Sequence, residues 1–207
     1  DANPSVIHAH LQQDSLLAKQ IEAVPGLRVP GAFDAFELAV RAVLGQQVSV
    51  AGATTLSGRL VTQFGEAVET PLAKVTHNFP DAHILAAADS ADIAKIGLPK
   101  TRAATIRNLA QFAAHGGLHM KPGTVLDEAV AHLKTVPGIG DWTAHYIALR
   151  ALRFPDAFPA GDLGLQKAAA PAHASTGRLT EKQLIARAGA WSPWRGYAAL
   201  LLWHSLG

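Results

Sequence analysis

Residues 133–148 read LKTVPGIGDWTAHYIA, and this stretch decides the predicted fold. Both ends have the apolar spacing of amphipathic helices, whereas Pro137, Gly138 and Gly140 fall together in the middle. Glycine is unfavourable inside a helix because its backbone loses the most freedom on ordering. The pattern therefore predicts a helix, a tight turn and a second helix.

Two interpretations of this turn are open. It is either an αα-hairpin whose glycines only satisfy the turn geometry, or a backbone site for an anion. In the second case, the N–H groups of the turn and of the next helix start point at the anion, and the helix dipole favours it. The missing side chains at Gly138 and Gly140 would then let a phosphate approach the backbone itself.

Helical periodicity and helix end signals continue along nearly the whole chain, and no segment alternates with the period of a strand. The expected class is therefore all-α. Helices are predicted from Pro4 with a break at Asp14 and Ser15, from Asp34 to Gly45, from Ser49 to Gly65, over 81–88, over 91–96 with Ser90 as the cap, over 100–114, over 126–135, from Asp141 to about Arg153, from Asp162 to Ala170, from Thr180 with Gln183 in a capping box, and from Ser192 and Pro193 to His204.

The composition excludes several classes of protein. The 207 residues are 49% hydrophobic, which is enough for one large domain or two small lobes. Cysteine is absent, which removes disulfides, thiolate metal sites, iron–sulfur clusters and cysteine nucleophiles. The formal net charge of +2 permits a polyanionic partner without requiring one. No apolar run approaches the length of a membrane span, so no membrane partner is expected.

Asp162 stands in the stretch FPAGDLGL, twenty residues after Trp142. Taken alone, an Asp in front of a helix is most often an N-cap, because its carboxylate accepts N–H groups of the first turn. However, only one helix and one loop separate it from the glycine turn, and these bring the chain back toward that turn. A functional role therefore stands beside the capping role.

Four stretches together carry a more specific signal: PGLRVPGAFDAFELAVRAVLGQQVSV (25–50), LKTVPGIGDWTAHYIALR (133–150), the Asp162 loop and WSPWRGYA (191–198). In these stretches the chain resembles the helix–hairpin–helix DNA glycosylase superfamily, and within it the 3-methyladenine DNA glycosylase II (AlkA-type) branch. The resemblance implies a two-lobed helical fold with the active site in the cleft between the lobes. On this basis 1–207 is expected to be one glycosylase domain of two helical subdomains, with the hairpin motif at about 126–153 and without the β-rich N-terminal domain of larger relatives.

Residue by residue, the resemblance places Asp162 on the family's catalytic aspartate. It places Trp142, Tyr146 and Trp194 on the family's aromatic base pocket. Core packing is the alternative for any one of these aromatics, but three of them in separate motifs around one acid favour a pocket. Electron-rich rings attract a cationic N-alkylated purine, and one carboxylate can stabilise an oxocarbenium-like transition state or activate the attacking water.

The resemblance also implies contacts with DNA. Gln47, with its neighbour Gln46, falls where the family inserts a wedge into the gap left by a flipped base; a polar turn is the alternative. The best-known relatives have an apolar residue at position 47. Phosphate binding is implied for Gly138, Ile139, Gly140 and Thr143, and a structural monovalent cation for the main-chain carbonyls of Lys134, Val136 and Ile139.

The expected function is that of a monofunctional DNA glycosylase that flips out alkylated purines and hydrolyses the N-glycosidic bond. The bifunctional members carry a Lys in the hairpin motif where this chain has Trp142, so no lyase activity is expected. Glycosylases for neutral lesions and a non-catalytic damage-binding protein are the alternatives. The expected partner is double-stranded DNA with damaged bases, bound by a monomer in the bacterial cytoplasm or a nucleus, with no cofactor for catalysis.

Overall fold

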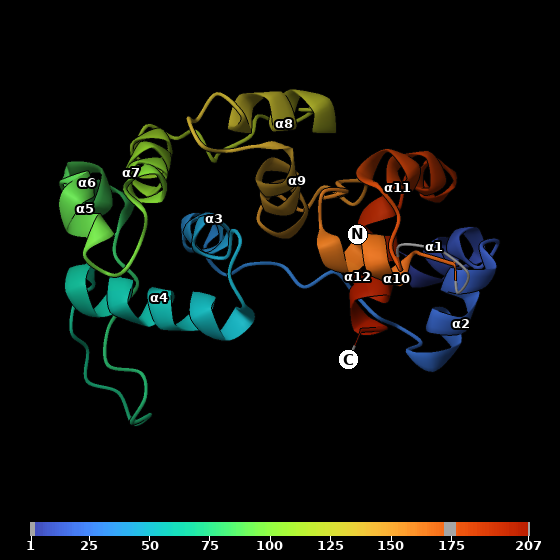
Figure 1. Ribbon diagram of the computed structural model, residues 1–207, viewed down its shortest axis with the longest axis horizontal. Coiled ribbons are helices and arrows are strands. Elements are labelled where there is room, and N and C mark those ends of the chain that lie inside the picture. The colour runs from blue at the N-terminus through green and yellow to red at the C-terminus, as the bar shows by residue number, and fades with distance from the viewer. Residues whose placement is uncertain (1–2, 172–176, 207) are drawn as a thin grey trace. The chain divides into compact units, whose positions relative to one another are not determined.

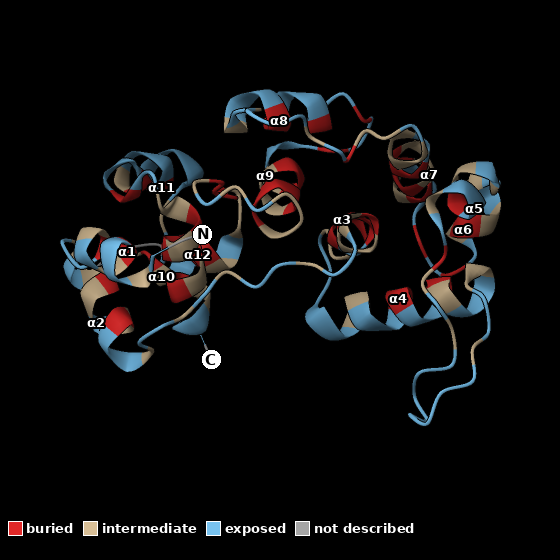
Figure 2. Cartoon of the chain, turned by 180° about the vertical axis from the view of Figure 1, so that it is seen from behind, coloured by how far each residue is buried: buried red, intermediate tan, exposed pale blue. Residues whose placement is uncertain are grey.

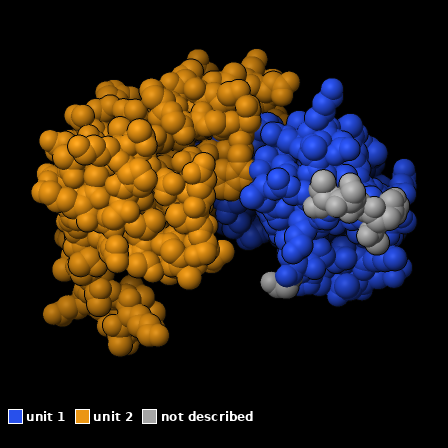
Figure 3. All heavy atoms as spheres, in the orientation of Figure 1, with its two compact units in different colours: residues 1–31, 144–207 blue, residues 32–143 orange. Residues whose placement is uncertain are grey.

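The structure is a computed structural model that describes residues 3–171 and 177–206 (Figure 1). These residues form α-helices and one 3-10 helix, with a single isolated bridge between Ala67 and His77 in place of any sheet. The all-α prediction is confirmed. The chain divides into two compact units, residues 1–31 with 144–207, and residues 32–143 (Figure 3). None of the described helices is long and apolar enough to cross a membrane.

The unit of residues 32–143 packs around α7, which lies against α3, α5 and α6, while α3 also packs on α4. Buried residues, coloured red, occur on each of these packed helices (Figure 2). The helices of this unit are α3 (Ala35–Leu44), α4 (Val50–Phe64), α5 (Ala82–Ala87), α6 (Ser90–Ala94), α7 (Lys100–Ala114) and α8 (Leu126–Leu133).

The other unit is discontinuous in sequence, because its N-terminal helices pack with the C-terminal ones. Here α12 packs against α2 and α10, and Trp191 is the largest fully buried side chain. The helices of this unit are α1 (Pro4–Leu11), α2 (Ser15–Ala23), α10 (Leu163–Ala168), α11 (Glu181–Ala188), the 3-10 helix η1 (Gly189–Trp191) and α12 (Arg195–His204). Helix α9 (Asp141–Arg150) begins in the first unit described and ends in this one.

Local capping explains most of the helix starts that the sequence predicts. The side chains of Asn3, Asp14, Asp34 and Ser49 each accept a backbone N–H of the helix that follows, and Thr180 forms the predicted capping box with Gln183. Each cap satisfies N–H groups that have no partner within the helix.

Two predicted starts were wrong. Asp89 rather than Ser90 caps α6, because its carboxylate accepts the Ala91 N–H at 2.9 Å. The last helix begins at Arg195 rather than at Ser192 and Pro193. There the capping group comes from a distant loop: the carboxylate of Asp156 accepts the Arg195 N–H at 3.1 Å. A cap supplied from 39 residues away leaves no local sequence signal.

The predicted end of the helix after the hairpin was three residues too late, because α9 ends at Arg150. The Phe154 N–H bonds back to the Ala148 carbonyl at 3.0 Å, and Arg153 takes a left-handed φ of 64°. This bond closes the end of the helix across six residues, and the left-handed position at a helix end usually holds glycine. An arginine there gives the sequence no stop signal.

Candidate active site and hairpin

Asp162 is half-buried at the N-terminus of α10, where its Oδ1 accepts the Leu165 N–H at 2.9 Å. The loop before it is tied to α9 by the Phe158 N–H, which donates to His145 Nδ1 at 3.2 Å. The Asp162 N–H itself donates to the Pro159 carbonyl at 2.9 Å. The capping interpretation of Asp162 is therefore confirmed, and the same contacts hold its carboxylate in a fixed place.

An indole N–H gives Asp162 its second described donor. Trp203 Nε1 donates to Asp162 Oδ1 at 3.0 Å, and the Trp203 ring meets the Tyr146 ring edge-on at a centroid distance of 6.1 Å. The structure thus brings together two residues that the sequence predicts, Asp162 and Tyr146, and one that sequence reasoning missed. Trp203 lies on the last helix among apolar residues, where its spacing indicates core. The available signal was that a buried indole N–H needs an acceptor.

Arg150 was also missed, although it stands one helical turn after Tyr146. Its Nη1 donates to the Tyr146 hydroxyl at 3.3 Å, and its guanidinium lies 5.7 Å from the centre of the Tyr146 ring. Its Nε donates to the Pro30 carbonyl at 2.8 Å. One face of the Tyr146 ring is therefore already close to a cation.

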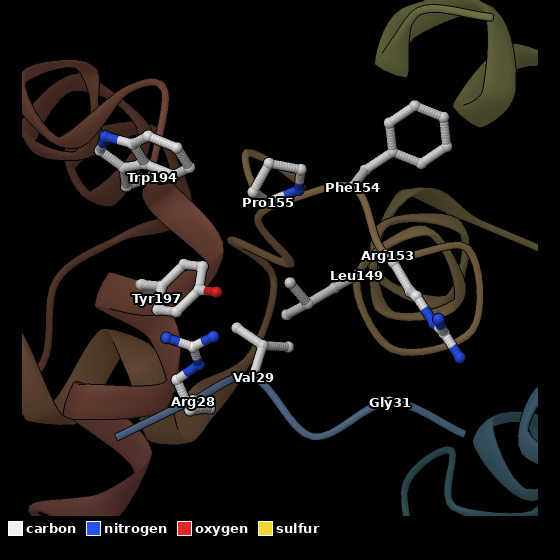
Figure 4. Close-up of a pocket in the computed structure, with 9 residues that line it drawn as sticks. All are labelled: Arg28, Val29, Gly31, Leu149, Arg153, Phe154, Pro155, Trp194 and Tyr197. Atoms are coloured by element: carbon white, nitrogen blue, oxygen red, sulfur yellow. The ribbon is translucent and has the colours of Figure 1, made fainter. Parts of the chain in front are cut away.

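The other two predicted pocket aromatics have different surroundings. Trp142 precedes Tyr146 by four residues on α9, so both side chains leave the same face of that helix. Trp194 packs edge-on against Tyr197 at a centroid distance of 6.2 Å, and these two rings line a pocket of about 650 Å³ (Figure 4). The lining of that pocket includes neither Asp162 nor Tyr146, so Trp203 rather than Trp194 is the indole beside the carboxylate.

The hairpin forms as predicted between α8 and α9, but the reason for one glycine differs from the expected one. Gly138 has a φ of 93°, and a Cβ added there would lie 2.8 Å from Thr105 Cβ and closer still to Thr105 Oγ1. Gly138 therefore lacks a side chain because the turn packs on α7 in a left-handed conformation. At Gly140, nothing lies within 4 Å of an added Cβ, so open space remains for an approaching group.

The residues predicted to bind a DNA phosphate differ in how far they are exposed to solvent. Ile139 is 5% exposed and anchors the turn from inside, while the flanking Gly138 and Gly140 are exposed. Thr143 is only 2% exposed, and its hydroxyl accepts Gln46 Nε2 at 2.9 Å. The hydroxyl could still donate its O–H to a phosphate, so it is the burial of Thr143 rather than its bond to Gln46 that disfavours such a contact. The exposed backbone of the turn is better placed for such a contact.

The carbonyls predicted for a monovalent cation lie in the same turn. The Val136 carbonyl accepts the Ile139 N–H at 3.0 Å, which uses one of its two lone pairs. Beside them, Lys134 Nζ pairs with Asp141 Oδ1 at 2.7 Å, so the local lysine charge is balanced. Backbone carbonyls are suitable ligands for a hard cation, and the cation site stays a prediction. The described residues contain no group of three or more His, Asp or Glu side chains suited to a metal ion.

Gln46 and Gln47, predicted together as the wedge, have opposite placements. Gln46 is half-buried, and its bond to Thr143 ties the α3–α4 turn to the start of α9. Gln47 is exposed at the tip of the turn, with a left-handed φ of 56°. A non-glycine residue held in this region is uncommon and costs free energy. Only Gln47 has the exposed position that an inserted side chain requires.

Comparison with known proteins identifies the family. Residues 40–193 match the family described as HhH-GPD superfamily base excision DNA repair protein. The chain belongs to this superfamily. Residues 1–34 match the AlkA N-terminal domain; the part of them that the structure describes contains α1 and α2 and no strand. The expected lack of the β-rich N-terminal domain of larger relatives stays a prediction.

Three similar proteins illustrate the relationship. The chain is 40% identical to the probable bifunctional transcriptional activator/DNA repair enzyme AlkA of Mycobacterium tuberculosis, with all of this chain and 40% of that protein covered. It is 39% identical to DNA-3-methyladenine glycosylase 2 of Escherichia coli, covering 99% of this chain and 67% of that protein. The chain thus spans well under half of the mycobacterial relative. The Schizosaccharomyces pombe 3-methyladenine DNA glycosylase, solved with abasic DNA, shares the fold with a TM-score of 0.78 and 20% identity over 96% of this chain and 95% of that one.

Proposed function

We propose that this chain is a DNA glycosylase that removes N-alkylated purines by hydrolysis of the N-glycosidic bond. The observation that carries this proposal is the carboxylate of Asp162 held by the Trp203 indole, whose ring contacts Tyr146. A carboxylate and electron-rich rings are the groups that a cationic base and a developing oxocarbenium ion require. The named relatives that act on 3-methyladenine in DNA support the substrate class.

In this mechanism the protein supplies charge and position, because an alkylated purine is already a good leaving group. The Asp162 carboxylate stabilises positive charge on the sugar or accepts a proton from the attacking water. Tyr146 and Trp203 receive the flipped base. The absence of lyase activity is part of the proposal, because Trp142 stands where bifunctional relatives are expected to carry a lysine.

The hairpin and the α3–α4 turn complete the proposal on the side of the DNA. The exposed backbone at Gly140 contacts a phosphate, and Gln47 fills the space left by the flipped nucleotide. A monovalent cation on the carbonyls of Lys134, Val136 and Ile139 would add positive charge beside that phosphate.

A second candidate function is the removal of neutral damaged bases. It is favoured by Arg150, whose guanidinium lies 5.7 Å from the centre of the Tyr146 ring. A cation near this ring reduces the advantage that the ring gives to a second cation. A panel of duplexes with one cationic or one neutral lesion each discriminates between the two functions.

The test of the main proposal is Asp162→Asn on that panel. Asparagine is also a good N-cap and still accepts from Leu165 and Trp203, so the fold should survive while the charge is lost. We expect base release to fall by more than 100-fold with damaged-DNA binding retained. Turnover within about tenfold of the parent, roughly 1.4 kcal/mol, would contradict the catalytic role. Cleavage of the DNA strand without added alkali would contradict the proposed absence of lyase activity.

A further inference from the structure

A separate concave site lies within the unit of residues 1–31 and 144–207 (Figure 4). Its volume of about 650 Å³ falls in the range of roughly 300–1,000 Å³ that is typical of small-ligand sites. Trp194 and Tyr197 form one wall, while Leu149 and Pro155 lie across from them. Asp162, Tyr146 and Trp203 of the proposed catalytic centre do not line it, so it is a separate site.

Hydrogen bonds hold the walls of this pocket in place. The Gly196 N–H, between the two wall aromatics, donates to the Pro155 carbonyl at 2.9 Å. Gly196 allows this approach because an added Cβ would lie 2.7 Å from the same oxygen. The carboxylate of Asp156 accepts Arg195 Nε at 2.8 Å and the Ser192 hydroxyl at 2.9 Å, which fixes the segment on both sides of Trp194.

The third wall, residues 28–31, is fixed to α9 by the bond from Arg150 Nε to the Pro30 carbonyl at 2.8 Å. All three walls are therefore tied together before any ligand arrives. A pocket formed in advance loses less conformational entropy on binding than one that must be ordered by its ligand.

Two arginines that line this pocket, Arg28 and Arg153, have no partner among the residues that the structure describes. Neither Arg28 nor Arg153 makes a hydrogen bond or ion pair within the described part of the chain, whereas Arg41, Arg187 and Arg195 each pair with a carboxylate. Arg153 also holds the left-handed φ of 64°, a conformation that a glycine would adopt more easily.

The two cations flank the pocket on different sides. Figure 4 shows Arg28 beside Tyr197, and Arg153 beyond Val29 and Leu149. A ligand that satisfies both needs a planar body for the aromatic wall and negative charge at each end. A guanidinium binds phosphate oxygens in a bidentate manner, and the rings of Trp and Tyr stack on nucleobases of any sequence.

We propose that this pocket binds one unpaired nucleotide, with its base stacked on one of the perpendicular rings of Trp194 and Tyr197 and its 5′ and 3′ phosphates on Arg28 and Arg153. The same chemistry is offered by a free nucleoside 3′,5′-bisphosphate and by a nucleotide within a single DNA strand. The site is distinct from Asp162, so its occupation does not depend on base release.

The test follows the indole N–H signal of Trp194 by NMR, assigned with Trp194→Phe. The probes are thymidine 3′,5′-bisphosphate, a thymidine hexanucleotide and inorganic phosphate. We expect a saturable shift with the bisphosphate, the hexanucleotide or both, and none with phosphate alone at the same concentration. A response only to the hexanucleotide identifies a DNA strand as the source, and a response only to the bisphosphate identifies a free nucleotide.

The variant Arg28→Gln/Arg153→Gln should raise the Kd for the responding probe at least tenfold. The matched control is Arg102→Gln, because Arg102 also lacks a described partner but does not line the pocket. Asp162→Asn should bind the probe like the parent even where base release is lost, which separates this site from the proposed catalytic one. Melting curves should verify that each variant is folded.

Three results would overturn the proposal. The Trp194 signal could show no saturable shift with either nucleotide probe, or Arg102→Gln could lose as much affinity as Arg28→Gln/Arg153→Gln. Finally, a hexaglutamate peptide could displace the nucleotide at equal concentration. The last result would assign the pocket to an acidic protein segment instead.

Discussion

Trp203 donates its indole N–H to Asp162 at 3.0 Å, and Trp191 donates to Asp14 at the same distance. The two pairs have the same chemistry but different surroundings. Trp191 is 1% exposed, and Asp14 also bonds to the Arg187 guanidinium at 3.1 Å. Asp162 and Trp203 are half-buried. The first pair serves the core, whereas the second presents a carboxylate and a ring at an accessible site.

This contrast predicts different effects of the same substitution. Trp203→Phe keeps an aromatic ring but removes the donor to Asp162, so single-turnover base release should slow by about tenfold with little change in thermal stability. Trp191→Phe removes the equivalent donor in the core and leaves a cavity. It should lower the free energy of unfolding by about 1–3 kcal/mol and leave base release unchanged under folded conditions.

Trp203→Leu separates the contributions of the ring and the hydrogen bond. If Trp203→Phe releases base as fast as the parent while Trp203→Leu is slow, the ring rather than the hydrogen bond carries the effect. If both variants match the parent, Trp203 has no part in the active site.

Local signals account for what could be predicted from the sequence. The caps Asn3, Asp34 and Thr180 each accept a backbone N–H from a residue no more than three positions ahead. A short stretch of sequence is therefore enough to predict each of these helix starts. Asp156 acts on Arg195 from 39 residues away, and Trp203 meets Asp162 across 41 residues. Such contacts depend on how helices pack, which periodicity does not specify.

The two glycines of the hairpin also show that sequence does not reveal tertiary contacts. The sequence marks Gly138 and Gly140 as equivalent, because both lack a side chain at a turn. The structure separates them, since Thr105 from α7 occupies the space beside Gly138 while the space beside Gly140 is open. Contact with Thr105 thus explains why position 138 is a glycine. At Gly140 no protein atom fills the space, which remains open to a ligand.

The two hairpin glycines should therefore respond differently to substitution. Gly138→Ala combines a clash with Thr105 and a left-handed backbone, so the free energy of unfolding should fall by at least about 1–2 kcal/mol. Gly140→Val should leave stability nearly unchanged and weaken binding to damaged and undamaged DNA equally, by about tenfold or roughly 1.4 kcal/mol. Chemical denaturation and fluorescence anisotropy measure the two effects. An unchanged Kd for Gly140→Val would exclude the phosphate contact.

Asp156 should make stability depend on pH. Its partial burial raises the pKa of the carboxyl, but hydrogen bonds from Arg195 and Ser192 outweigh this, and the net pKa is lowered. A lowered pKa in the folded state gives stability that is present above the unfolded value of about 3.9 and is lost as the pH falls through the folded value. The melting temperature of Asp156→Asn should lie below that of the parent at pH 7, and the gap should begin to narrow as the pH falls below about 3.9. A gap that is independent of pH would contradict the charged role of Asp156.

Gln46 and Gln47 allow a direct test of the wedge, because one is tied inward and the other is exposed. Gln46→Ala loses the bond to Thr143 and should lower the free energy of unfolding by about 0.5–1.5 kcal/mol. Gln47→Ala should leave stability close to that of the parent. It should slow release from every duplex, because unstacking a base costs a few kcal/mol and no side chain then fills the gap.

The identity of residue 47 should also set which lesions are released fastest. An amide is more polar than an aliphatic side chain, so it compensates less for lost stacking, and poorly paired lesions should be released faster than well-paired ones of similar leaving-group quality. Gln47→Leu should narrow that difference. Single-turnover release from matched duplex and single-stranded substrates measures it, and the single strand controls for chemistry because it needs no wedge. Gln47→Gly controls for the backbone, since glycine accepts the left-handed φ of 56° without strain. If Gln47→Ala and Gln47→Gly both match the parent on duplex DNA, residue 47 is a polar turn and not a wedge.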